Sequence, residues 1–169
     1  MPVSLGKKFE EHFSTQLEDA AICFDRFKDD TAGYKGIRNI CDFSVFFNGY
    51  LFYIECKSIH GKTFNYANLT DNQYTGLLDK CEYDKVIAGV LIWFIDCDVT
   101  VFVPISVIKQ HKELLNYKSF KSYEIPDMCT IFEGKKLRKF FKYDIDKNLS
   151  TIIRLSLIHI SEPTRHSLI

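Results

Sequence analysis

The feature that most constrains this chain is the dipeptide Asn48-Gly49, which joins two apolar runs in the stretch CDFSVFFNGYLFYIECKS. A type I′ turn needs positive φ at both central residues, so Asn-Gly between alternating apolar runs is a strong hairpin signal. Two turn residues also fix the pairing of the strands, so that Phe43 faces Ile54. We therefore expect a β-hairpin with one defined register.

The same register places charged residues on this apolar hairpin. Asp42 faces Glu55 by the same count, which predicts two carboxylates with Cβ atoms roughly 5 Å apart. Because side chains alternate along a strand, Lys57 shares their face and the aromatic residues form the other face. Like charges directly opposite each other destabilise a sheet, so the pattern favours a cation beside the two carboxylates.

A divalent metal ion is one candidate for that cation. Mg²⁺ prefers oxygen ligands and commonly takes one or two carboxylates while keeping several waters, and Mn²⁺ can substitute for it. The ion would polarise a phosphoryl oxygen and lower the pKa of a water, and Lys57 would orient that water or stabilise the developing charge. The chemistry suggested is phosphodiester hydrolysis. The alternative is that Asp42, Glu55 and Lys57 are ordinary charges on the solvent face of the sheet.

Hydrophobic spacing and capping signals predict the remaining elements. In chain order they are a helix at 5–21 with Ser4 as N-cap, the hairpin, a helix after the capping-box pair Thr70 and Gln73, strands at 86–95 and 99–103, and a helix at 104–115. The strand at 86–95 is apolar throughout, which is typical of a strand buried on both faces. This order predicts an α/β domain with a mixed central β-sheet flanked by helices.

The chain length of 169 residues fits one domain, which we place at residues 1–154. The final segment LSLIHISEPTRHSLI, residues 155–169, resembles the in-frame translation of a sequencing adapter. We therefore expect a non-native tail, with the natural sequence cut near Arg154.

Composition limits the classes of partner. The formal net charge is zero, so any contact with nucleic acid has to come from a local basic patch. The six cysteines lack a CxxC motif, and we expect reduced core thiols in a soluble cytoplasmic protein. No apolar run approaches the roughly 18 residues of a membrane span.

The segment GKKLRKFFKYD, residues 134–144, concentrates basic side chains. At helical spacing, Leu137 and Phe140 fall on one face, and most of the basic residues fall on the other: Lys135, Arg138, Lys139 and Lys142. The pattern predicts a helix whose basic face is either simply solvated or in contact with a phosphate backbone.

Three motifs together resemble a known family. Asp42 followed thirteen positions later by Glu-x-Lys resembles the PD-(D/E)xK nuclease signature, and is most similar to RecU-type Holliday-junction resolvases. The segment GKKFE resembles the N-terminal Gly-x-x-x-Glu segment of that family, where Glu10 is the helix-borne acidic residue. The segment NGYLFYIECKSIHGKTFNYANLTDNQ resembles the following run, which ends in a helix bearing the site glutamine, here Gln73.

The resemblance implies a restriction-endonuclease-like core and a metal-dependent endonuclease that nicks branched DNA as a homodimer in recombination and repair. It makes Asp42, Glu55, Lys57, Gln73 and Glu10 the catalytic set, with Asp42 and Glu55 binding Mg²⁺. It also implies the cytoplasm of a bacterium or of a phage-infected cell.

Two departures from the bacterial members stand out. Leu5 occupies the place of an arginine, and only the segment 25–40 is available for the basic stalk that enters the junction. A phage-encoded relative is typically short in this way, and the departure leaves junction specificity open.

Several assignments have a second interpretation. Gln73 can simply close the capping box, and Glu10 can be favoured by the helix dipole alone. Basic residues near the strands can contact phosphate or merely be solvated: Lys35, Arg38 and Lys62. The same site would serve a restriction-like or repair nuclease. A non-catalytic DNA-binding module would show a broken Asp/Glu/Lys set, which is intact here.

Overall fold

The computed structural model describes residues 4–27 and 39–160. Its helices are α1 (Leu5–Asp19), α2 (Asp71–Cys81), α3 (Ile105–Glu113) and α4 (Ile145–Ile160), with single turns η1 (Tyr66–Asn68) and η2 (Ile95–Cys97). Its strands are β1 (Cys23–Arg26), β2 (Phe43–Phe47), β3 (Tyr50–Ile59), β4 (Thr63–Asn65), β5 (Val86–Phe94), β6 (Val99–Pro104), β7 (Ser119–Lys121), β8 (Thr130–Ile131), β9 (Gly134–Lys136) and β10 (Phe141–Tyr143).

Six strands form the central sheet, in the order β1-β2-β3-β5-β6-β8. Only β3 and β5 pair in parallel, and the other neighbours are antiparallel. Parallel neighbours need a crossover, which here contains α2. The predicted mixed sheet with flanking helices is confirmed.

The hairpin register is confirmed for the five pairs from the turn to Phe43. Asn48 and Gly49 have φ of 48° and 79°, as a type I′ turn requires. The ladder runs from Phe47 opposite Tyr50 to Phe43 opposite Ile54. This register aims alternate apolar side chains of both strands into one core.

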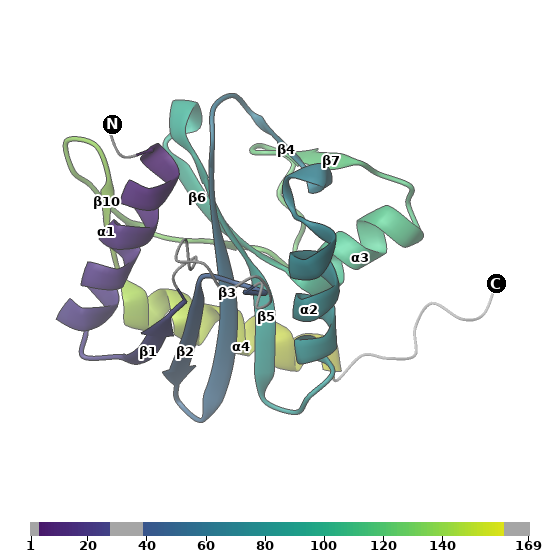
Figure 1. Cartoon of the computed structure of the whole chain (residues 1–169), viewed down its shortest axis with the longest axis horizontal. Helices are drawn as coiled ribbons and strands as arrows, with labels where there is room; N and C mark the ends of the chain where they lie inside the picture. Colours follow the sequence, from purple (N-terminus) through teal and green to yellow (C-terminus); the bar gives the residue numbers. More distant parts are fainter. Residues whose placement is uncertain (1–3, 28–38, 161–169) are drawn as a thin grey trace, which may run out of the picture.

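Two hydrophobic cores lie on the two faces of the sheet, since residues that alternate along β5 belong to different clusters. One core joins side chains of α1 and α4, such as Phe13 and Leu149, to β2 and β3. The other joins α2 and α3, through Leu77 and Ile108, to β5 and β6. Figure 1 shows α2 and α3 beside each other on one side of the sheet, and α1 beside β10 on the other.

The predicted helix at 134–144 is wrong. This segment forms an antiparallel hairpin of β9 and β10, in which Lys135 pairs with Lys142. A Cβ atom at Gly134 would come within 2.6 Å of the carbonyl oxygen of Lys142, so glycine permits this close approach. The aromatic residues of β10 favour a strand, and tertiary contacts with α1 decide between the two periodicities.

The C-terminal helix was not predicted. Leu149 and Ile152 of α4 are buried in the core beside α1. The helix continues to Ile160, six residues past Arg154, and the non-native origin of residues 155–169 stays a prediction. None of the helices in the described parts of the chain is long and apolar enough to cross a membrane.

Candidate active site

Asp42 lies in a bend immediately before β2, and three hydrogen bonds fix its position. Its backbone N–H donates to Ile54 O (3.1 Å), and its carbonyl oxygen accepts from Phe27 N–H (2.8 Å). Its carboxylate oxygen Oδ2 accepts from Cys56 N–H at 2.7 Å. Asp42 is therefore held by β1 on one side and by β3 on the other.

This arrangement corrects one detail of the sequence prediction. The ladder ends at Phe43 and Ile54, so Asp42 and Glu55 are not a regular cross-strand pair. The carboxylate of Asp42 instead turns along β3 to bond the backbone of Cys56. The two carboxylates still lie close enough to interact strongly, because each affects the pKa of the other.

Glu55 is a buried carboxylate, exposed by only 2%. It lies in the middle of β3, on the face covered by α2. Its Oε1 accepts from Gln73 Nε2 at 2.5 Å and from Lys57 Nζ at 2.7 Å. Its Oε2 is buried and has no hydrogen-bond partner among the described residues. Glu55 is thus not an ordinary charge on the solvent face of the sheet, because a buried carboxylate oxygen without a hydrogen-bond partner costs free energy of folding.

Lys57 and Gln73 complete the polar group around Glu55. Lys57 follows Glu55 on the same face of β3, and its Nζ lies 3.5 Å from Gln73 Oε1. Gln73 also closes the predicted capping box, since Thr70 N–H donates to its Oε1 at 3.1 Å. The two interpretations of Gln73 are therefore compatible, because the cap orients the amide whose other end reaches Glu55.

Glu10 lies on α1 and is paired with Arg26 of β1 (3.1 Å). It is not hydrogen-bonded to Asp42 or Glu55 in the described structure, yet its charge raises the pKa of both. Sequence reasoning missed Arg26, because the short strand that carries it was not predicted. It also missed the orienting N–H of Cys56, which no side-chain motif reveals.

Burial dominates the electrostatics of this site. Burial, and then the charge of Glu55, raise the pKa of Asp42 to about 8. Burial also raises the pKa of Glu55, against the lowering effect of Lys57. Burial raises the pKa of the neighbouring Cys41 thiol to about 12, so this cysteine stays protonated. The carboxylates need a further cation to be ionised together at neutral pH.

The residues present fit a divalent metal ion of the hard, oxygen-binding kind. The described residues contain no group of three or more His, Cys, Asp and Glu that could hold a metal. Two carboxylates with a free, buried Glu55 Oε2 nevertheless match the donor set of Mg²⁺, which keeps several waters. Asp42 and Glu55 are the residues that would hold it.

The other predicted DNA-contacting residues lie apart from this cluster. Lys35 and Arg38 fall outside the described residues. Lys62 is exposed in the turn after β3, and its carbonyl oxygen accepts from Ser122 N–H. The basic residues predicted near the C-terminus lie on the β9–β10 hairpin, where all are exposed: Lys135, Arg138 and Lys139.

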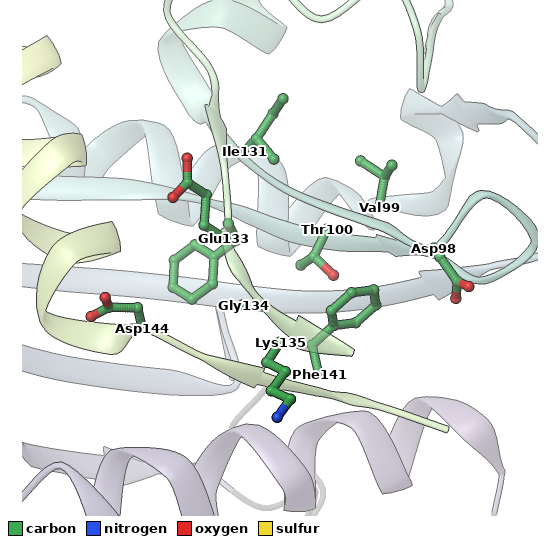
Figure 2. A pocket seen from close by; sticks show the side chains of 10 residues that line it. Asp98, Val99, Thr100, Ile131, Glu133, Gly134, Lys135, Phe141 and Asp144 are labelled. Carbon is green, nitrogen blue, oxygen red and sulfur yellow. The ribbon is translucent and has the colours of Figure 1, made fainter. Parts of the chain in front are cut away.

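A cavity lies away from this cluster. It measures about 610 Å³ and lies between β6, β8 and the β9–β10 hairpin. Figure 2 shows Asp98, Glu133 and Asp144 around it, together with Lys135. It contains none of the residues around Glu55, so it is separate from the carboxylate cluster.

Comparisons with known proteins agree with the motifs. The model of a family described as RecU, recombination protein U, matches residues 18–145. No curated protein matches the chain. The structure is similar to that of Hjc from Archaeoglobus fulgidus, described as a Holliday junction resolvase from an archaeal hyperthermophile. That similarity has a TM-score of 0.48 at 19% identity and covers 69% of this chain and 86% of Hjc.

Proposed function

This chain belongs to the RecU family of recombination proteins, the Holliday-junction resolvases, and on that premise we propose that it cuts branched DNA at the Asp42–Glu55 cluster. Members of this family are metal-dependent endonucleases. The reaction class is hydrolysis of a phosphodiester bond in DNA, and the buried carboxylate of Glu55 is the observation that carries the proposal.

Each residue of the cluster has a role that its contacts support. Asp42 and Glu55 would hold Mg²⁺, which would supply Lewis-acid polarisation of the phosphate and a more acidic water. Lys57 orients the attacking water or stabilises the negative charge that develops on the phosphate. Gln73 fixes the orientation of Glu55 through its amide N–H. Glu10 adjusts the electrostatics of the site from α1.

Substrate contact and assembly belong to the same proposal. Lys35, Arg38 and Lys62, which flank the hairpin in the sequence, contact DNA phosphates. The active form is a homodimer, because a symmetric pair of sites can cut two opposed strands of a near-symmetric four-way junction. A dimer mass in light scattering, with or without DNA, is the expected result.

The decisive experiment compares nicking of a four-way junction and of linear duplex, with Mg²⁺ and without it. We expect the junction to be nicked only with Mg²⁺, and Glu55→Ala to lower the rate by at least about 100-fold, because it removes half of the proposed ligand set. Asp79→Ala, an exposed change on α2, is the matched control and should nick like the wild type. Equal nicking by Glu55→Ala would disprove the site, and equal nicking of both DNAs would disprove junction preference.

A further inference from the structure

The tip of the β9–β10 hairpin forms a second basic surface, outside the carboxylate cluster. A cavity of about 440 Å³ is lined by residues of the tip and one residue of α1: His12, Leu137, Arg138, Lys139 and Phe140. This lining contains cationic and apolar side chains and no acidic one. Arg138 and Lys139 form no ion pair within the described parts of the chain, and both are exposed.

The two sides of this hairpin differ in charge. On the side toward β6, Lys136 pairs with Asp98, and Glu133 and Asp144 also line the cavity there (Figure 2). At the tip, nothing acidic lines the cavity.

The tip is fixed rather than loosely attached. The ring of His12 stacks on Phe140 at 4.8 Å, and its Nε2 lies 2.7 Å from Phe141 O. A carbonyl oxygen can only accept, so Nε2 carries the proton. At the base of the hairpin, Tyr143 N–H donates to Gln16 Oε1 at 2.5 Å. The hairpin and α1 therefore present one preformed surface.

The tip also lies within reach of DNA bound at the carboxylate cluster. Phe140 contacts Trp93, with ring centroids 5.2 Å apart, and Trp93 pairs with Ser58, the residue after Lys57. Trp93 and Phe140 lie on the α1 side of the sheet and Lys57 on the side covered by α2, so one strand spacing, one ring contact and the step across the sheet place the tip on the order of 15 Å from Lys57. At 3.4 Å per phosphate, this distance is about four or five nucleotides along one strand.

We propose that the tip of the β9–β10 hairpin, with Arg138 and Lys139 as its cations and His12 beside them, binds the sugar–phosphate backbone of a DNA arm beyond the cutting site. The inference rests on the proposed function, since it assumes that DNA lies at the carboxylate cluster. The DNA backbone is a polyanion with regularly spaced phosphates. It fits a surface on which Arg138 and Lys139 lie beside apolar side chains without forming ion pairs in the described parts of the chain.

The test measures binding of a fluorescent four-way junction in EDTA, where no cutting occurs, over a series of salt concentrations. Arg138→Gln with Lys139→Gln should raise Kd roughly tenfold at 100 mM salt. It should also reduce the slope of log Kd against log salt by about 2, because two phosphate contacts are lost. The matched control, Lys80→Gln with Lys109→Gln, removes equal charge from α2 and α3 and should change Kd less than about twofold.

Each alternative outcome has a defined meaning. If the hairpin variant and the control lose affinity equally, the effect is general electrostatics and the inference is overturned. If the double variant does not fold, Arg138→Gln alone replaces it and should lower the slope by about 1. Salt-dependent binding through the hairpin without any nicking would overturn the proposed function and leave this inference standing. Absence of DNA binding by the wild type would overturn both.

Discussion

Gln73 shows how one side chain links helix formation to the chemistry of the site. Its Oε1 accepts from the N-cap residue Thr70, and its Nε2 donates to Glu55. The cap stabilises the first turn of α2, and the same hydrogen bonds hold the amide so that an N–H rather than a carbonyl oxygen faces the carboxylate. The two roles can be separated, because Thr70 takes part only in the cap.

We therefore predict different results for two alanine variants of this cap. Thr70→Ala should lower the free energy of unfolding by about 1 kcal/mol through the lost cap, with little change in nicking per folded molecule. Gln73→Ala should cost similar stability and also lower the nicking rate roughly 10- to 100-fold, because Glu55 loses its orienting donor. Urea unfolding and single-turnover nicking measure the two effects. Equal nicking by the two variants would leave Gln73 as a cap alone.

Individual residues of the site could be predicted from the sequence only where the backbone geometry of the hairpin is regular. The turn at Asn48-Gly49 determines which residues of the two strands meet, so Asp42 and Glu55 could be brought together by counting. The count could not show that Asp42 leaves the ladder to bond the N–H of Cys56, because this depends on the end of the pairing. The pairing of Glu10 with a residue of β1 required the tertiary fold.

At the scale of elements, α2 packs closely against the segment before β2. Gly76 of α2 packs against Ile40, two residues before Asp42. A Cβ atom at position 76 would lie 2.3 Å from Ile40 Cγ2 and 2.8 Å from Ile40 Cβ. A rotamer change cannot relieve the second contact, so the helix or the strand entrance has to move.

The resulting prediction concerns Gly76→Ala. Alanine gains about 1 kcal/mol of helix propensity, but the overpacking costs about 1–3 kcal/mol and dominates at these distances. We expect lower stability and slower nicking, both partly restored by adding Ile40→Ala, which removes the nearer atom. The control Asp79→Ala, exposed on the same helix, should have neither effect. A stabilised Gly76→Ala with normal nicking would mean that α2 adjusts freely against this segment.

The basic hairpin illustrates which elements a sequence leaves ambiguous. Residues 134–144 satisfy a helical spacing of apolar residues, but Phe141 and Tyr143 also alternate with Lys142, as in a strand. Tertiary contacts decide whether such a short segment forms a helix or a strand. Here the contacts are those with His12 and Gln16 of α1. Long apolar elements such as β5 have no such ambiguity, and their positions were predicted well.

For the molecule as a whole, the site is a source of instability in the absence of metal. Two carboxylates are held close together, and burial raises the pKa of both, with the charge of Glu55 adding to the rise at Asp42 and that of Glu10 adding to the rise at Glu55. In the unfolded chain they ionise near pH 4, without that cost. Ionisation therefore favours the unfolded chain unless a cation is bound. The fold supplies Lys57 as a partial counter-charge, and this leaves Glu55 Oε2 without a partner.

This balance predicts that the metal-free protein becomes less stable as pH rises. The pKa of Asp42 is about 8 in the fold against 3.8 as the ordinary value, so its contribution is fully present below pH 4 and is lost as pH rises toward 8. In EDTA, Tm should fall between pH 5 and 8 by roughly 4–8 °C, on the order of 2 kcal/mol. Asp42→Asn should reduce this fall, and Asp79→Asn, exposed on α2, should not.

Added Mg²⁺ provides the complementary measurement. An ion that binds the folded state alone raises Tm, and it binds ionised carboxylates most strongly, so the gain should be larger at pH 8 than at pH 5. Asp42→Asn and Glu55→Gln should each lose most of that gain. A Tm that does not change with pH in EDTA, together with equal stabilisation of wild type and Glu55→Gln by Mg²⁺, would show that the two carboxylates are neither strained nor metal ligands.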